Sequence, residues 1–313
     1  MFRSGAAQQA AGASASEAPL RLAGAARRSF DQTSVTALDP LLRLFVTDMV
    51  APYHLGLRED LLVDGAGHSF GEMAEPLIAE LVPAGQPVEL LVLAFSLHDL
   101  RLGRATATYL SHRCPGAPFA FAVCDQGVAA AFTGLRLIDA YARTGGCRRA
   151  LLLVLEQSAL HYELAVPAPV PTRHAGVGLL LDRDGGAELR PVRQHPRLAP
   201  YEVTGRLVAE VTALTGARED VTLILGAGIE EEPAGLVAEV LRTPDGQPST
   251  GPWWQLAGGL DRWADQQRLV ILADYDRNLG YLSIAAADQA GATTLRQPAA
   301  LAGAIPSGPG GRR

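Results

Sequence analysis

The sequence predicts an α/β fold made of two halves in which strands and helices alternate with a similar rhythm. Residues 88–95 and 150–155 are near-continuous apolar runs, as expected of strands covered on both faces of a parallel sheet. A strand at 119–123, an amphipathic helix at 127–143 and the strand at 150–155 together predict a βαβ unit. The alternation returns after residue 200, which indicates a duplicated core.

The remaining elements of the first half follow from spacing and turn residues. Residues 69–82 carry apolar side chains at helical intervals, and residues 103–114 predict a short helix that a Pro-Gly pair ends. Residues 176–181 and 187–192 predict two strands joined by an Asp-Arg-Asp-Gly-Gly turn, which is typical of a hairpin.

The second half begins after a proline-interrupted linker. Its predicted elements are a helix from Tyr201, a strand at 221–225, helices at 233–241 and 253–264, and strands at 269–273 and 281–286. Three glutamates at 230–232 suit the N-terminus of the helix at 233–241 electrostatically. We divide the chain into a disordered start (1–17), an N-terminal half (18–192), a C-terminal half (193–290) and a Gly/Pro-rich flexible tail (291–313).

Composition excludes several classes of protein. With 313 residues, 48% hydrophobic content and 19% charge, the chain can bury a large core. The net charge of −6, without a run of basic residues, gives no surface for nucleic acid. The three cysteines form neither a disulfide framework nor a metal-binding pattern, so we expect a reducing cytoplasm and no metal. The absence of a long apolar run predicts a soluble protein that does not enter membranes.

Cys124 is the clearest candidate for chemistry, because it falls at the predicted turn between the strand at 119–123 and the following helix. The dipoles and free N–H groups of a helix N-terminus favour the thiolate, which is the nucleophilic form. The same N–H groups could form an oxyanion hole. The alternative is that Cys124 is a small core residue, as free cysteines often are.

Six stretches, in order and in spacing, resemble the β-ketoacyl-ACP synthase III branch of the thiolase superfamily. The nucleophile turn around Cys124 is the central one, and the next strand carries a matching Glu156 and Ser158. The stretches are 54–59, 93–99, 121–132, 151–158, 173–178 and 272–282. The resemblance implies a thiolase-like, duplicated αβαβα layered core, a dimer, and Cys124 as the residue that accepts the acyl group.

Two departures from that family bear on mechanism. Its decarboxylating members use a His and an Asn to stabilise the enolate, but the loop expected to carry the His reads Gly-Ala-Gly at 226–228. At the expected Asn position, the amide survives one methylene further out, on Gln247. Asn278 aligns with a glycine-rich turn, where an Asn that tolerates positive φ has a structural explanation.

A substitute base is therefore sought elsewhere in the sequence. His98 is the first choice, because it ends the strand before the nucleophile unit, in a loop that approaches the cysteine in the family's fold. Its structural alternative is a polar cap beside Asp99. His174, where the family has Asp, is the second choice. The other five histidines are expected at solvated positions, namely 54, 68, 112, 161 and 195.

The resemblance implies an acyltransferase that moves an acyl group from a coenzyme A or acyl-carrier-protein thioester through a Cys124 acyl-enzyme. The thioester is then a substrate, and no further cofactor is expected. By analogy with the family, the resemblance also implies a role in specialised-metabolite or fatty-acyl biosynthesis. One alternative is a non-catalytic subunit that pairs with an active ketosynthase, so the dimer is a homodimer or a heterodimer. Another is a decarboxylating condensing enzyme.

Overall fold

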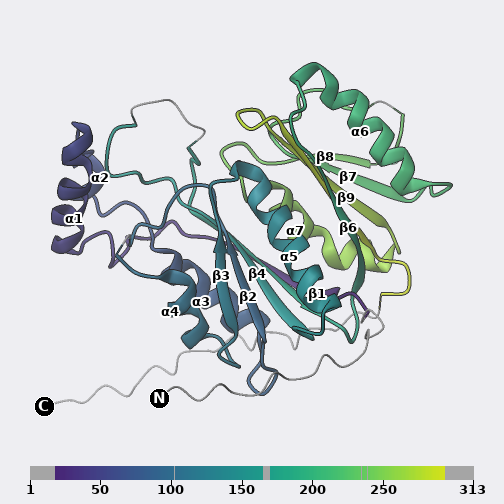
Figure 1. Cartoon of the computed structure of the whole chain (residues 1–313), viewed down its shortest axis with the longest axis horizontal. Coiled ribbons are helices and arrows are strands. Elements are labelled where there is room, and N and C mark those ends of the chain that lie inside the picture. The colour runs from purple at the N-terminus through teal and green to yellow at the C-terminus, as the bar shows by residue number, and fades with distance from the viewer. Residues whose placement is uncertain (1–17, 102, 165–169, 234, 238, 293–313) are drawn as a thin grey trace, which may run out of the picture.

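A computed structural model of the chain describes residues 18–292, apart from 102, 165–169, 234 and 238. The predicted disordered start (1–17) and nearly all of the predicted tail (291–313) lie outside the described residues. The described residues form a ten-stranded mixed sheet and seven α-helices (Figure 1). None of these helices is long and apolar enough to cross a membrane.

The elements largely match the predicted alternation. The strands are β1 (Arg21–Ser29), β2 (Leu90–Ala94), β3 (Phe119–Val123), β4 (Arg149–Glu156), β5 (Ala175–Asp182), β6 (Ala187–His195), β7 (Val221–Leu225), β8 (Glu239–Arg242), β9 (Leu269–Asp276) and β10 (Tyr281–Asp288). The helices are α1 (Pro40–Val50), α2 (Glu59–Val63), α3 (Phe70–Leu81), α4 (Thr106–Arg113), α5 (Ala130–Arg143), α6 (Pro200–Thr215) and α7 (Gly251–Asp265), with short 3-10 helices η1 (Ala51–Tyr53) and η2 (Gly127–Ala129).

The strand order shows the duplication. In the first half, β3, β2 and β4 run parallel, and β5 and β1 follow antiparallel. In the second half, β8, β7 and β9 run parallel, and β10 and β6 follow antiparallel. The halves meet where β1 pairs with β6 at Arg21 and Leu22. The carboxyl ends of the parallel strands carry the residues of the candidate site.

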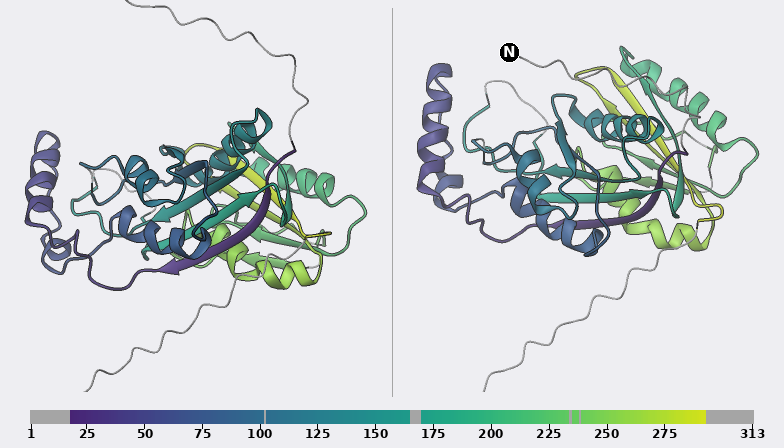
Figure 2. Two further views of the ribbon diagram at one scale, coloured as in Figure 1. Left: turned by 90° about the horizontal axis from the view of Figure 1, so that it is seen from below. Right: turned by 60° about the horizontal axis from the view of Figure 1, so that its bottom comes forward.

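Helices cover and separate the two halves (Figures 1 and 2). α5 contacts β2 and β4 of one half and β6 and β10 of the other, and α7 likewise contacts strands of both halves. Between them Phe132 of α5 and Trp253 of α7 are fully buried, with ring centroids 4.8 Å apart. α3 and α4 cover the outer face of the first half, and α6 packs against β9 on the second. α1 stands at one end of the molecule, outside these layers.

The predicted hairpin between residues 176–181 and 187–192 is wrong. Both segments are strands, but β1 lies between β5 and β6 in the sheet and pairs with each of them. β6 pairs along its length with β10 of the second half. The predicted division at 192/193 therefore falls inside β6.

The predicted helix at 233–241 is also wrong. Its last residues enter β8, which pairs in parallel with β7 at the edge of the sheet. Gly235 has a φ of 74°, which is outside the helical region. The described residues from 230 to 237 contain no helix, so the glutamates at 230–232 do not begin one.

Candidate active site

Cys124 lies where the sequence predicts, between strand β3 and the helical segment formed by η2 and α5. Its side chain is partly buried. The chain reverses through Asp125, which has a φ of 59°, and Gly127, which has a φ of 50°. Asp tolerates this left-handed conformation better than most residues. The tight turn brings the thiol to the end of the parallel strands.

The electrostatic environment of Cys124 differs from the expected one, in which the helix N-terminus favours the thiolate. Its Sγ lies 3.5 Å from Oδ2 of Asp125, to which the thiol donates a weak hydrogen bond. Burial raises the pKa of Cys124, and the adjacent Asp125 carboxylate raises it further. The N–H of Val128 at the helix start donates to Oδ2 of Asp276 at 3.2 Å, so this donor is already engaged. The resting group at Cys124 is therefore a thiol rather than a thiolate stabilised by the helix.

Replacing Asp125 by Asn is expected to lower the pKa of Cys124, because the substitution removes the negative charge beside the sulfur and keeps the side-chain size. Alkylation of Cys124 by iodoacetamide at pH 8 should then be faster than in the parent. The measurement is the rate of mass gain as a function of pH. Glu163→Gln, which changes an exposed carboxylate elsewhere, is the control. A pH profile for Asp125→Asn that coincides with the parent's would remove Asp125 as a cause.

His98 lies in the loop after β2. At the start of this loop the N–H of Phe95 donates to the carbonyl of Val123, beside the nucleophile turn. Both nitrogens of the His98 ring have partners. Nδ1 lies 2.9 Å from the carbonyl of Asp99 and must carry the proton, since a carbonyl only accepts. Nε2 accepts from the Tyr162 hydroxyl at 2.7 Å. His98 would have to release Tyr162 before it could act as a base, and its catalytic role stays a prediction.

His174 lies before β5 and faces Ser158. Its Nδ1 accepts from the Ser158 N–H at 3.2 Å, and Nε2 lies 3.3 Å from the Ser158 hydroxyl. Burial and the neighbouring His68 lower the pKa of His174 to about 4. The expectation that His68 and His161 are solvated is wrong, because they are only 7% and 2% exposed. The pKa of each is lowered by burial, so these rings are neutral at pH 7.

Gln247 is buried before α7, next to Glu156 at the end of β4. Its Nε2 donates to the Thr250 hydroxyl at 3.2 Å, and its Oε1 has no hydrogen-bond partner among the described residues. Glu156 accepts from the N–H groups of Ser249 and Thr250 at 2.8 and 3.2 Å and from the Thr250 hydroxyl. Burial nevertheless raises the pKa of Glu156 to about 7.

Asp274, which sequence reasoning missed, lies on β9 against the loop at 226–228, where the resemblance to the synthase family would place a histidine. A Cβ on Gly226 would come 1.9–2.3 Å from the Asp274 carboxyl group, so the glycine leaves room for that carboxyl. Asp274 accepts from the N–H groups of Tyr275 and Gly228 at 2.8 and 3.3 Å. Burial raises its pKa to about 7, with further contributions from the charges of Asp276 and Glu156. The available signal was an acidic residue directly after the apolar run at 269–273.

The segment at the end of β4 gathers three of the four predicted site residues. Glu156 binds Thr250, the partner of Gln247; the amide of Gln157 donates to the carbonyl of His98 at 3.4 Å; and Ser158 binds His174. Cys124 lies on the neighbouring turn and contacts none of these side chains within hydrogen-bond distance among the described residues. Two carboxyl groups contact this turn, Asp125 at the thiol and Asp276 at the N–H of Val128.

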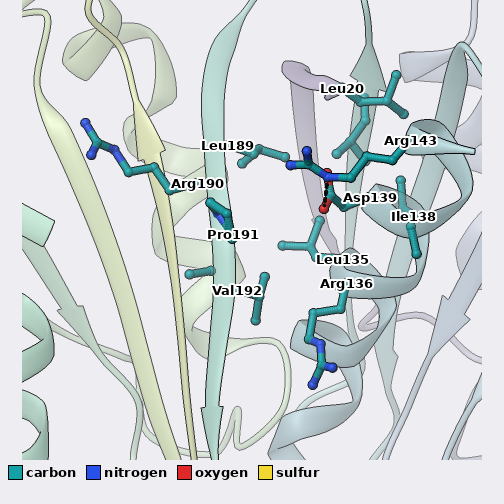
Figure 3. A pocket seen from close by; sticks show the side chains of 13 residues that line it. Leu20, Leu135, Arg136, Ile138, Asp139, Arg143, Leu189, Arg190, Pro191 and Val192 are labelled. Carbon is teal, nitrogen blue, oxygen red and sulfur yellow. Dashed lines mark hydrogen bonds and ion pairs between the residues drawn. The ribbon is translucent and has the colours of Figure 1, made fainter. Parts of the chain in front are cut away.

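A separate pocket of about 310 Å³ lies between α5 and β6 (Figure 3). Its walls are mainly apolar, and the arginines on it have partners. Arg143 pairs with Asp139, Arg136 with Gln194 and Arg190 with Asp288. None of the described residues that line it is a nucleophile or one of the candidate bases, so the candidate site remains at Cys124. No group of three or more His, Cys, Asp or Glu among the described residues could hold a metal ion.

Comparison with known proteins identifies the fold. No protein-family profile matches the sequence, and neither does any curated protein. Among solved structures, AbyA1, a tetronic acid condensing enzyme, covers 86% of this chain and 99% of its own length, at 19% identity and a TM-score of 0.60. The 3-oxoacyl-(acyl carrier protein) synthase III of Pseudomonas aeruginosa covers 88% and 100%, at 14% identity and 0.56. ChlB3, described as an acyltransferase, covers 87% and 98%, at 13% identity and 0.55.

These similarities confirm the predicted thiolase fold of the ketoacyl synthase III type. The chain spans nearly the full length of these structures, including both halves of the duplicated core. The neighbours are condensing or acyl-transferring enzymes. At 13–19% identity these similarities show the fold, so an activity has to be argued from the site.

Proposed function

We propose that this chain transfers an acyl group from a coenzyme A or acyl-carrier-protein thioester through an acyl-enzyme on Cys124. The observation that carries the proposal is a partly buried thiol on a left-handed turn, within a fold shared with acyl-transferring and condensing enzymes. Sγ attacks the thioester carbonyl, the bond to the carrier sulfur breaks, and the thiol proton leaves with the carrier thiol. An acceptor nucleophile then takes the acyl group and returns a proton to Cys124.

Simple transfer fits the surroundings of Cys124 better than decarboxylative condensation. The loop at 226–228 carries no imidazole, and the nearby groups Asp274 and Glu156 are carboxyls with a pKa raised to about 7. Such groups can donate or accept a proton at neutral pH, but in their ionised form they do not stabilise the negative charge of an enolate. A nucleophilic acceptor from specialised-metabolite or fatty-acyl biosynthesis needs no enolate.

The second candidate function is a non-catalytic subunit that pairs with an active synthase. Asp125 beside Cys124 favours it, because a raised thiol pKa opposes nucleophilic attack. The glycines at 226 and 228 favour it as well. In that case the dimer would contain a second, active ketosynthase-like chain.

Intact-protein mass spectrometry after incubation with acyl-CoA and acyl-carrier thioesters separates the two candidates. We expect one acyl mass on the parent and on Cys147→Ala, a control that removes a buried cysteine, and none on Cys124→Ala. An adduct that persists in Cys124→Ala would place the acyl group on another residue. No adduct with any donor, with co-purification of a second ketosynthase-like chain, would support the non-catalytic subunit.

A further inference from the structure

A pocket of about 290 Å³ lies on the outer face of the first half, under α4 and beside the nucleophile turn. Its walls are apolar where they meet the sheet, formed by Phe70, Leu93, Phe95 and Ala122. The rings of Phe70 and Phe95 lie 5.1 Å apart. A pocket of this size accommodates a short chain rather than a drug-sized ligand.

The pocket is close to Cys124 along the strand. Ala122 on its wall is two residues before Cys124, and two residues of extended chain span at most about 7 Å. Phe95 on the same wall is hydrogen-bonded through its N–H to the carbonyl of Val123 at 3.2 Å. Cys124 itself is not among the residues that line the pocket, so an acyl group on its sulfur would reach the pocket by extending past Ala122.

Arg104 lines the opposite side of the pocket and has no carboxylate partner within 4 Å among the described residues. Its guanidinium lies over the Tyr109 ring at 4.0 Å, and its Nη2 reaches the Ser69 hydroxyl only at 3.5 Å. Its Nε is buried and finds no acceptor in the described part of the chain. Gly71 allows this placement, since a Cβ there would come 2.3 Å from Nη2. A guanidinium that is held in place by neutral groups and has no carboxylate within 4 Å among the described residues is prepared for a carboxylate.

The neighbouring Arg113, in contrast to Arg104, has a carboxylate partner. It lies near the same Tyr109 ring, at 5.7 Å, but pairs with Glu75 at 3.0 Å and does not line the pocket. Arg101, at the rim, is half exposed and lies 3.9 Å from Asp39. Arg101 and Arg104 therefore give the pocket a net positive charge among its described lining residues.

The other charged and polar groups of the pocket are consistent with an anion. Asp99 is its one carboxylate among the described lining residues, and both of its oxygens are engaged, by the N–H groups of Phe70 and Arg101 and by the Thr106 hydroxyl. The first turn of α4 also lines the pocket, and no side chain caps this helix. Its free N–H groups add positive potential to that of Arg104.

We propose that this pocket selects a short acyl group that ends in a carboxylate, with Arg104 binding the carboxylate and the apolar wall holding the methylenes. The inference rests on the proposed acyl transfer through Cys124 and names the class of acyl donor. Arg104 is then a specificity residue for a dicarboxylic acyl thioester.

The test compares N-acetylcysteamine thioesters of glutarate and pentanoate, which share a five-carbon chain and differ in the terminal carboxylate. The rate of Cys124 labelling, followed by intact mass, is expected to be roughly tenfold or more higher for the glutaryl thioester. Arg104→Met should remove this preference while pentanoyl labelling continues, which shows that the variant is folded. Arg113→Met should keep the parent's preference. Equal rates for the two thioesters in the parent, or the same preference in Arg104→Met, would overturn the proposal.

A binding measurement separates this inference from the proposed function. If neither thioester labels Cys124, calorimetric titration of both thioesters into the Cys124→Ala chain, with and without Arg104→Met, decides it. Glutaryl binding about tenfold or more tighter than pentanoyl binding, lost with Arg104→Met, would support the pocket even if acyl transfer fails. Equal affinities would overturn the pocket, whatever the outcome for acyl transfer.

Discussion

Asp274→Asn is expected to become progressively more stable relative to the parent as the pH rises from 5 to 8, by about 3 kcal/mol in unfolding free energy. The pKa of Asp274 is raised by burial from its ordinary 3.8 to about 7. Between these values the folded chain binds more protons than the unfolded chain, so the parent loses stability as the pH rises. Asn removes that loss, because it stays neutral.

The substitution should preserve the local hydrogen bonds. Oδ1 of Asp274 accepts from the N–H groups of Tyr275 and Gly228, and the amide oxygen of Asn can accept both. No hydrogen bond to Oδ2 is formed by the described residues, so the amide nitrogen displaces no partner. The effect is therefore expected to come from charge.

The unfolding free energy must be compared between the parent and Asp274→Asn, because the buried histidines change the stability of the parent with pH in the opposite direction. The pKa of His174 is lowered to about 4 and those of His68 and His161 are lowered as well, so the unfolded chain binds more protons below pH 6.5. Their contribution rises with pH up to that point. It is the same in parent and variant and cancels in the difference.

Urea unfolding at several pH values gives the free energies, with Asp288→Asn as the matched control. Burial raises the pKa of Asp288, but hydrogen bonds from Arg190 and Arg218 outweigh it and hold the pKa below 3.8. Its contribution is lost only as the pH falls through this lowered value, so the control should show a constant penalty between pH 5 and 8. A constant difference for Asp274→Asn as well would mean that Asp274 is ionised throughout.

Most strands of the two parallel cores, though not β8, could be predicted because they carry their own signal. β2, β4, β7 and β9 are apolar runs, and α5 has an apolar face of helical period. β1 could not be predicted, since Arg21–Ser29 consists mostly of Ala, Gly and Arg. It is a strand because β5 and β6 offer it backbone partners on either side. The helix predicted at 233–241 failed for the same reason, as pairing with β7 decides the conformation of β8.

The candidate site shows the same contrast between features with a local sequence signal and features that depend on distant residues. Cys124 could be found because its turn is local, and Glu156 because it ends an apolar strand. The electrostatic environment of Cys124 could not be predicted from the sequence. It depends on the Asp125 side chain and on Asp276, which lies 148 residues after Val128. The place of Asp274 beneath the loop at 226–228 depends on how β7 packs beside β9. No spacing pattern within the sequence indicates this contact between Asp274 and the loop.

Gly228→Ala is expected to destabilise the chain by at least about 3 kcal/mol. A Cβ on Gly228 would lie 1.7 Å from the carbonyl oxygen and 2.8 Å from the carbonyl carbon of Tyr275. These are backbone atoms of β9, a strand buried between its neighbours, and they cannot move aside as a flexible side chain would. The loop would have to leave β9 and give up the hydrogen bond from the Gly228 N–H to Asp274.

Gly205→Ala provides the matched control, because it makes the same chemical change in the middle of α6 with nothing within 4 Å of the new Cβ. It should stabilise the chain by about 0.5–1 kcal/mol through helix propensity. Thermal and urea unfolding of both variants measure the contrast, and two variants of equal stability would show that the loop yields easily. If the loop is as tightly held as these distances indicate, no side chain fits at Gly228, and one at Gly226 would collide with Asp274. Restoring a histidine at Gly228 would therefore require the loop to move away from β9, because the backbone of Tyr275, and not the Asp274 side chain, is the first obstacle there.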